Sequence, residues 1–266
     1  MTDNRLRVSD ADLYYGLRGQ GPLVLLVGAP MDATAFGPLA ELLAADHTVL
    51  TTDPRGINRS TLDDPDQDST LPQRADDLAR LIDHLDAGPA VAFGSSGGAV
   101  GVLALAERYP DRVGAVIAHE PPLDELVDDR DKLRVQTEEM IAAYLSGDIR
   151  GAWARFMETA NIQLPPPVFE AMFGTPRAGQ MAADERFQFE HMLRATTRWR
   201  PDTEALRCGP VRIVVGIGEQ SAGQLCDRTS RALAARLGTP PAMFPGGHIG
   251  FVDDLSAFAA RLRAHL

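Results

Sequence analysis

Short apolar segments alternate with amphipathic ones over the first half of the chain. Residues 23–27, 89–93 and 113–118 are apolar runs typical of buried parallel strands. Residues 34–45 and 71–85 place their apolar side chains on one helical face. Alternation of this kind predicts an α/β fold, a parallel sheet covered by helices.

The alternation stops near Leu123 and resumes at Val211. Helical stretches at 132–145, 149–161 and 186–198 fill the interval, interrupted by three consecutive prolines at 165–167. We therefore expect a core made of residues 1–121 and 204–266, with residues 122–203 inserted as a helical cap over the carboxyl edge of the sheet. Aromatic and methionine side chains of the cap are expected to form part of an apolar substrate pocket.

The segment Gly94-Ser95-Ser96-Gly97-Gly98 joins one of the apolar runs to a small-residue helix expected over 99–109. This is the G-x-S-x-G pattern in the strand, turn and helix setting that its chemistry needs. Glycines are required around the central residue because a Cβ would collide with the neighbouring strand and helix. Ser96 is the predicted nucleophile.

A serine nucleophile needs a base, and the base needs an acid that orients it. His248 is the predicted base, because it lies in a glycine-rich loop between the last expected strand, 241–245, and an amphipathic helix. Two glutamates compete as the acid: Glu120, which follows the run 113–118, and Glu219, which follows the run 211–216. We favour Glu120 because the two prolines after it fix its backbone, and Glu219 remains the alternative.

Together these motifs resemble the α/β-hydrolase superfamily over nearly the whole chain. Residues 23–30 resemble its third strand and oxyanion turn, and residues 52–60 resemble its D-x-R-G-x-G-x-S signature, with Asn58 where glycine is usual. Residues 94–98 match the nucleophile elbow, and His248 matches the catalytic histidine. The resemblance implies the serine-nucleophile branch, with a doubly wound, mostly parallel sheet of eight strands and an inserted cap.

The resemblance also bears on the acid and the oxyanion hole. Most members have an aspartate after the strand that follows the cap, where this chain offers Glu219 or, two residues on, Ser221. A minority, including one branch of haloalkane dehalogenases and the zearalenone-lactone hydrolases, has a glutamate after the preceding strand, as at Glu120. The implied oxyanion donors are the backbone N–H groups of Gly97 and Ala29.

These residues predict a serine hydrolase that cleaves a medium-sized apolar ester or lactone through an acyl-enzyme. The same triad serves C–C bond hydrolysis and perhydrolysis, and an inactive hydrolase fold can serve as a ligand-binding protein, so these remain alternatives. Because Ser96 stands where dehalogenases and epoxide hydrolases have an aspartate, the sequence argues against an alkyl-enzyme intermediate.

Composition narrows the expected partners to a small-molecule substrate. A net charge of −11 argues against nucleic acid and anionic membranes, and no apolar run is long enough to span a bilayer. The first residues lack a secretion-signal pattern, and two cysteines are too few for a disulfide framework, so we expect a cytoplasmic protein with free thiols. Histidine and cysteine spacing indicates neither a metal nor a cofactor. The sequence does not indicate an oligomeric state.

Overall fold

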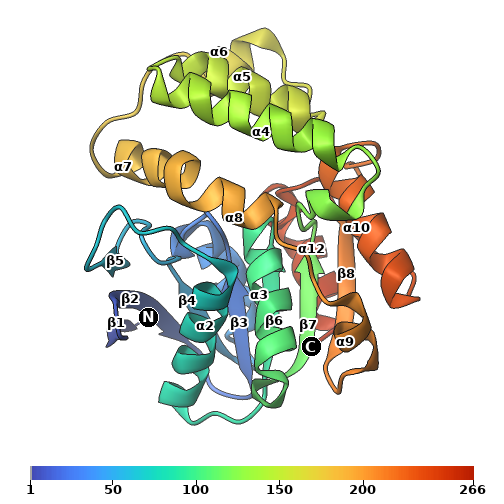
Figure 1. The fold of residues 1–266 in the computed structure, drawn as a ribbon. Helices are drawn as coiled ribbons and strands as arrows, with labels where there is room; N and C mark the ends of the chain where they lie inside the picture. The colour runs from blue at the N-terminus through green and yellow to red at the C-terminus, as the bar shows by residue number, and fades with distance from the viewer. Residues whose placement is uncertain (1) are drawn as a thin grey trace.

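A nine-stranded sheet runs through the computed structural model, which describes residues 2–266 (Figure 1). Eight strands follow the order β1-β2-β4-β3-β6-β7-β8-β9, and the two-residue β5 pairs with β2. The pairs β1–β2, β2–β4 and β2–β5 are antiparallel and the other neighbours are parallel, which confirms the predicted fold class. The strands are β1 (Thr2–Arg7), β2 (Ala11–Arg18), β3 (Leu23–Val27), β4 (Thr48–Thr52), β5 (Thr61–Leu62), β6 (Ala90–Ser95), β7 (Val113–His119), β8 (Arg212–Gly218) and β9 (Ala242–Phe244).

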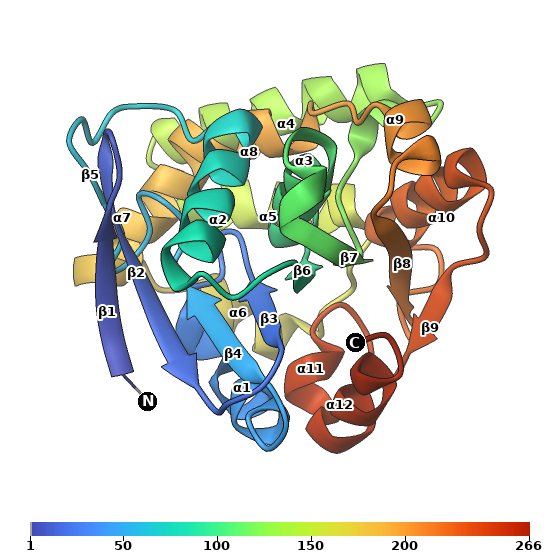
Figure 2. The same cartoon turned by 90° about the horizontal axis from the view of Figure 1, so that it is seen from below.

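Helices cover both faces of this sheet (Figure 2). One face packs against α2, α3, α9 and α10 and the other against α1, α11 and α12, and each face has its own buried apolar cluster. The central strand β3 is apolar throughout because both of its faces are buried; all five of its residues are buried. These helices are α1 (Gly37–Leu43), α2 (Leu71–Leu85), α3 (Gly97–Arg108), α9 (Thr203–Cys208), α10 (Leu225–Leu237), α11 (Gly250–Asp253) and α12 (Leu255–Arg263).

Most of the segment between β7 and β8, the helices α4 to α8, forms a layer of its own beyond the carboxyl ends of the parallel strands (Figure 1). It has its own buried cluster, which includes Met140, Trp153 and Phe189. The buried Arg74 of α2 joins this layer to the core, since it donates to Thr196 Oγ1 at 2.8 Å and to the Met192 carbonyl at 3.3 Å. The helices of the layer are α4 (Arg130–Leu145), α5 (Ile149–Ala160), α6 (Pro166–Phe173), α7 (Gly179–Phe187) and α8 (Leu193–Thr197).

Two details of this layer differ from the sequence expectation. The three prolines were expected only to interrupt the helices, but Pro166 and Pro167 occupy the first turn of α6, where the missing N–H groups cost nothing. The stretch expected as one helix over 186–198 is the end of α7, a π-helical turn at Gln188–Met192 and then α8.

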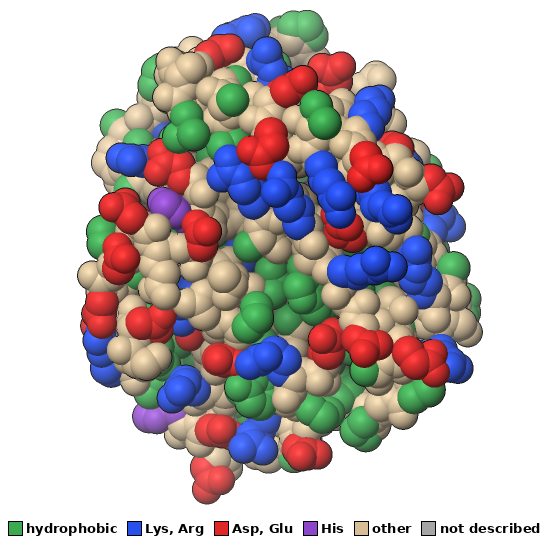
Figure 3. Space-filling view, viewed as in Figure 1, with side chains coloured by type: hydrophobic (Ala, Val, Ile, Leu, Met, Phe, Trp, Pro, Cys, Tyr) green, Lys and Arg blue, Asp and Glu red, His purple; other side chains and the backbone are tan. Residues whose placement is uncertain are grey.

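Charged side chains gather on one face of the molecule at the level of α4 and α8 (Figure 3). Arg194 and Arg198 both bond Glu138 of α4, the first at 2.9 Å, so these two arginines are paired with acid. Within residues 2–266, no helix is both long enough and apolar enough to cross a membrane.

Candidate active site

Ser96 occupies a strained turn between β6 and α3. Its backbone has φ 56° and ψ −125°, a conformation that L-residues rarely adopt, and its N–H donates to the His119 carbonyl at 2.9 Å. A Cβ on Gly94 would lie 2.4 Å from the Gly98 carbonyl oxygen, and a Cβ on Gly98 would lie 2.1 Å from that of Val27. Glycine is therefore the residue that lets the strand and the helix approach closely enough to form this turn.

Glu120 follows β7 directly and its side chain is fully buried. Its N–H donates to the Gly216 carbonyl at 3.0 Å, and its Oε1 accepts from the Gly218 N–H at 2.8 Å. Its Oε2 lies 2.6 Å from His248 Nδ1. Both carboxyl oxygens are thus engaged, one by the backbone of β8 and the other by the imidazole.

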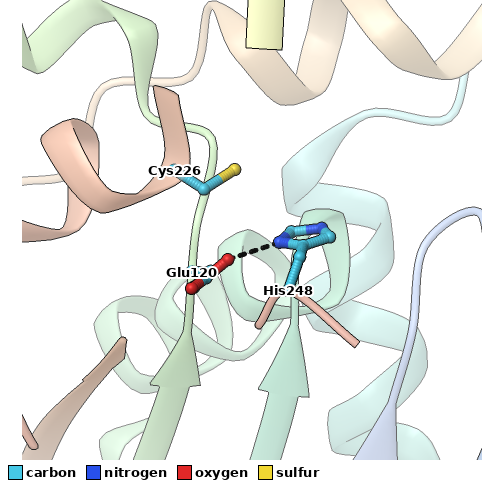
Figure 4. Close-up of side chains that lie close together, drawn as sticks. All are labelled: Glu120, Cys226 and His248. Carbon is cyan, nitrogen blue, oxygen red and sulfur yellow. Dashed lines mark hydrogen bonds and ion pairs between the residues drawn. The ribbon is translucent and has the colours of Figure 1, made fainter. Parts of the chain in front are cut away.

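The charges of Glu120 and His248 determine which of the two groups carries a proton. Burial would raise the pKa of Glu120, but the hydrogen bond and the charge of His248 lower it below its ordinary value. An ionised carboxylate only accepts, so His248 Nδ1 is the donor, and Nε2 is left to accept a proton. Figure 4 shows the two groups facing each other, with the sulfur of Cys226 beside them.

The pKa of His248 is raised above its ordinary value. Burial acts to lower it, and the Cys226 sulfur, when it is a thiolate, and the Glu120 carboxylate oppose burial and prevail. Burial also raises the pKa of the Cys226 thiol, so this thiol is neutral at pH 7 and Glu120 supplies the charge that acts on His248.

Ser96 and His248 open onto the same cavity, which measures about 120 Å³. One water needs roughly 10–15 Å³ of such space, so the cavity has room for a substrate group. Among the described residues no hydrogen bond joins Ser96 Oγ to His248, although both residues line this cavity. The other lining side chains include Met140, Phe156 and Met192 of the helical layer, and Asp124, Thr137, Gln188, Thr196, Thr197, Gln224 and Cys226.

The two expected oxyanion donors also line this cavity. Gly97 is the first residue of α3, and the first N–H groups of a helix have no partner within it. The backbones of Gly97 and Ala29 touch, since a Cβ on Gly97 would lie 2.4 Å from the Ala29 carbonyl oxygen. The structure thus brings Ser96, His248, Glu120, Gly97 and Ala29 together, whereas the side chain of Glu219 is exposed and makes no hydrogen bond or ion pair with His248 among residues 2–266.

Sequence reasoning missed two residues of this site, Cys226 and Asp124. The sulfur of Cys226, a carboxylate oxygen of Glu120 and a ring nitrogen of His248 lie within 4.8 Å of one another, a grouping that could hold a metal ion. The oxygen and nitrogen of the pair already bond each other, however, which favours an acid–base pair. Nothing in the sequence near Cys226 indicates that it reaches this site. Asp124 could have been noticed as an acid between two leucines, Leu123 and Leu126, which the structure shows to be buried in the core.

The chain belongs to the α/β hydrolase family, whose sequence model, described as "Alpha/beta hydrolase family", matches residues 23–261. It is an enzyme of the hydrolase class. The uncharacterized hydrolase YraK of Bacillus subtilis (strain 168) is 29% identical over 267 residues, which cover 98% of this chain and 95% of that protein. Zearalenone hydrolase of Bionectria ochroleuca is 27% identical over 259 residues, 92% of this chain and 90% of that one.

Solved structures share the fold. Est816, described as an N-acyl homoserine lactone degrading enzyme, superposes with a TM-score of 0.75 at 20% identity, covering 99% of this chain and 100% of that one. An identity this low establishes the common fold alone.

Proposed function

We propose that this hydrolase is a serine enzyme that cleaves a carboxylic ester or lactone through an acyl-enzyme. The observation behind the proposal is the hydrogen bond of His248 to the buried Glu120, at the sheet edge where Ser96 opens onto the same cavity. His248 takes the proton of Ser96 as its oxygen attacks the carbonyl, and Glu120 stabilises the imidazolium.

The remaining steps use the backbone around the turn. The N–H groups of Gly97 and Ala29 hold the negative oxygen of the tetrahedral intermediate, a role worth about 3–4 kcal/mol per donor in comparable sites. His248 then returns its proton to the leaving alcohol. Water activated by the same histidine releases the acid and restores Ser96.

The helical layer is proposed as the cap that selects the substrate, with residues 122–203 as cap and residues 1–121 and 204–266 as catalytic core. Its separate apolar cluster supports this division. Met140, Phe156 and Met192 of the layer face the cavity, which favours a medium-sized apolar acyl group. Two similar proteins are named for zearalenone hydrolysis and N-acyl homoserine lactone degradation, which supports including lactones among the candidates.

A fluorophosphonate probe tests the nucleophile directly. We expect one adduct, located on Ser96 by peptide mass spectrometry, and turnover of p-nitrophenyl esters that Ser96→Ala abolishes. Ser95→Ala is the matched control, because this neighbouring serine is fully buried in β6, and it should keep most of the activity. Absence of the adduct, or full activity of Ser96→Ala, would reject the serine mechanism.

A further inference from the structure

One carboxyl of the cavity has no part in the proposed mechanism. Asp124 begins the short 3-10 helix Asp124–Leu126, and its side chain lines the same cavity as Ser96 and His248. Only 3% of the residue is exposed. Leu123 and Leu126 pack in the core cluster on either side of it, so the backbone that positions this carboxyl is held firmly.

Asp124 differs from the acids around it in having no partner. Glu125 bonds Arg134 at 2.7 Å, and Asp129 bonds Arg228. Among residues 2–266, no hydrogen bond or ion pair involves the Asp124 side chain, and its Oδ1 is buried without a partner. Buried polar groups nearly always find one, so this carboxyl calls for an explanation.

A ligand in the cavity is a partner that this carboxyl can take, since Asp124 lines the cavity. A buried carboxyl without a hydrogen bond destabilises the fold, most of all when it is ionised. Burial, together with repulsion from Glu125 and Asp129, raises the pKa of Asp124 to about 7 against the opposing charge of Arg228. Near neutral pH the group therefore exists in both forms, and the protonated form can donate one hydrogen bond and accept others.

We propose that Asp124 is the polar anchor of the pocket and binds a hydroxyl group on the substrate, remote from the scissile carbonyl. The inference rests on the proposed function and names its substrate class, a hydroxylated ester or lactone. A hydroxyl both donates and accepts, so it pairs with either form of the carboxyl. A carboxylate on the substrate would be repelled, and an ammonium group would share the cavity with the His248 imidazolium formed during catalysis.

Matched substrates test the anchor. We would measure kcat/KM for p-nitrophenyl esters of graded acyl length, each with and without a terminal hydroxyl. At one chain length the wild type should prefer the hydroxylated ester by about tenfold or more, mainly through KM, since an unmade bond to a buried group costs on the order of 1–3 kcal/mol. Asp124→Leu should reduce this preference to about twofold or less, and Asp124→Asn, whose amide also donates and accepts, should keep part of it. Asp128→Asn is the matched control, because Asp128 follows Asp124 closely in the chain but is exposed.

The outcomes separate this anchor from the serine mechanism. A missing fluorophosphonate adduct would reject the mechanism, whereas equal turnover of both esters at every chain length would reject only the anchor. The anchor would also be rejected if Asp124→Leu kept the preference, or if an ester with a terminal ammonium were preferred to the hydroxylated one.

Thermal unfolding gives a readout independent of activity. Replacing an unpartnered carboxyl should raise the Tm of Asp124→Asn and Asp124→Leu above that of the wild type at pH 8, where the carboxyl is ionised. A lower Tm in both variants would mean that the carboxyl has a structural partner, and would overturn the proposal.

Discussion

The loops after β7 and β8 both begin with a glutamate, but the two glutamates have different surroundings. Each loop follows a buried parallel strand, and the glutamates are Glu120 after β7 and Glu219 after β8. Glu120 is fully buried, and its two oxygens bond Gly218 N–H and His248. The side chain of Glu219 is exposed, and its N–H bonds the Phe244 carbonyl.

The difference shows that a place after a strand does not by itself bring a glutamate to His248. β8 supplies a carbonyl to the backbone of Glu120, through Gly216, and an N–H to its side chain, through Gly218. The end of β8 therefore acts as the platform that holds the Glu120 carboxylate, and the glutamate that follows β8 is left in solvent.

The largest expected effect comes from removing the charge of Glu120. Glu120→Gln should lower kcat by about 10³–10⁴-fold, because an amide neither stabilises the imidazolium nor selects the correct tautomer of His248. Ester hydrolysis measures the loss. The control Glu219→Gln should stay within about twofold, as expected for an exposed surface group. A large loss in Glu219→Gln alone would assign the acid to the other loop.

The platform can be disturbed without touching either glutamate. A Cβ on Gly218 would lie 2.7 Å from the Gly247 carbonyl oxygen, in the loop that holds His248, and backbone at that distance has to move. Gly218→Ala should lower kcat by about 10–100-fold through misplacement of the histidine, with KM changed less. Gly114→Ala is the control, since a Cβ there meets nothing within 4 Å. Equal activity of the two variants would show that β8 does not position the site.

Much of the fold was predictable from the sequence because its signals are local. The range 71–85, predicted from its apolar face, is that of α2. In the structure Thr70 and Gln73 form a capping box at its start, and Asp86 ends it in the left-handed conformation. The glycines around Ser96 likewise report a local steric demand.

The site was less predictable because its contacts are not local. Spacing could not choose between Glu120 and Glu219, since the bonds that distinguish them come from the backbone of β8. Cys226 reaches the site only through the packing of α10. The choice of Glu120 as the acid remains a prediction until the variants are measured.

His119, the last residue of β7, packs where β7 meets β8. We expect it to affect the stability of the fold and not catalysis. It pairs with Gly216 of β8 in register, and its ring is fully buried against Phe93, Phe244 and Phe258. Burial lowers the pKa of His119 to about 4. Below about pH 6.5, His119 is therefore protonated in the unfolded chain but neutral in the folded protein. The free energy of unfolding falls as the pH falls from about 6.5 to 4.

His119→Phe should remove this dependence. Over that pH window the wild type should lose on the order of 3 kcal/mol of unfolding free energy more than the variant does. Urea denaturation at several pH values measures the unfolding free energy of both proteins. Other titrating groups contribute equally to both, so their contributions cancel in the difference between wild type and variant. Parallel stability curves for the two proteins would mean that His119 is not held neutral.

The smallest expected effect is on the titration of His248 itself. NMR of the imidazole in a Ser96→Ala background should give a pKa above the ordinary value of about 6.5, because the Glu120 carboxylate favours the imidazolium. Adding Glu120→Gln should lower that pKa by about one unit or more, the usual effect of losing an adjacent opposite charge. Adding Cys226→Ser should lower it less, since the neutral thiol contributes no charge at pH 7. A larger shift in the cysteine variant would show that the sulfur, and not the β7 glutamate, sets the protonation of the base.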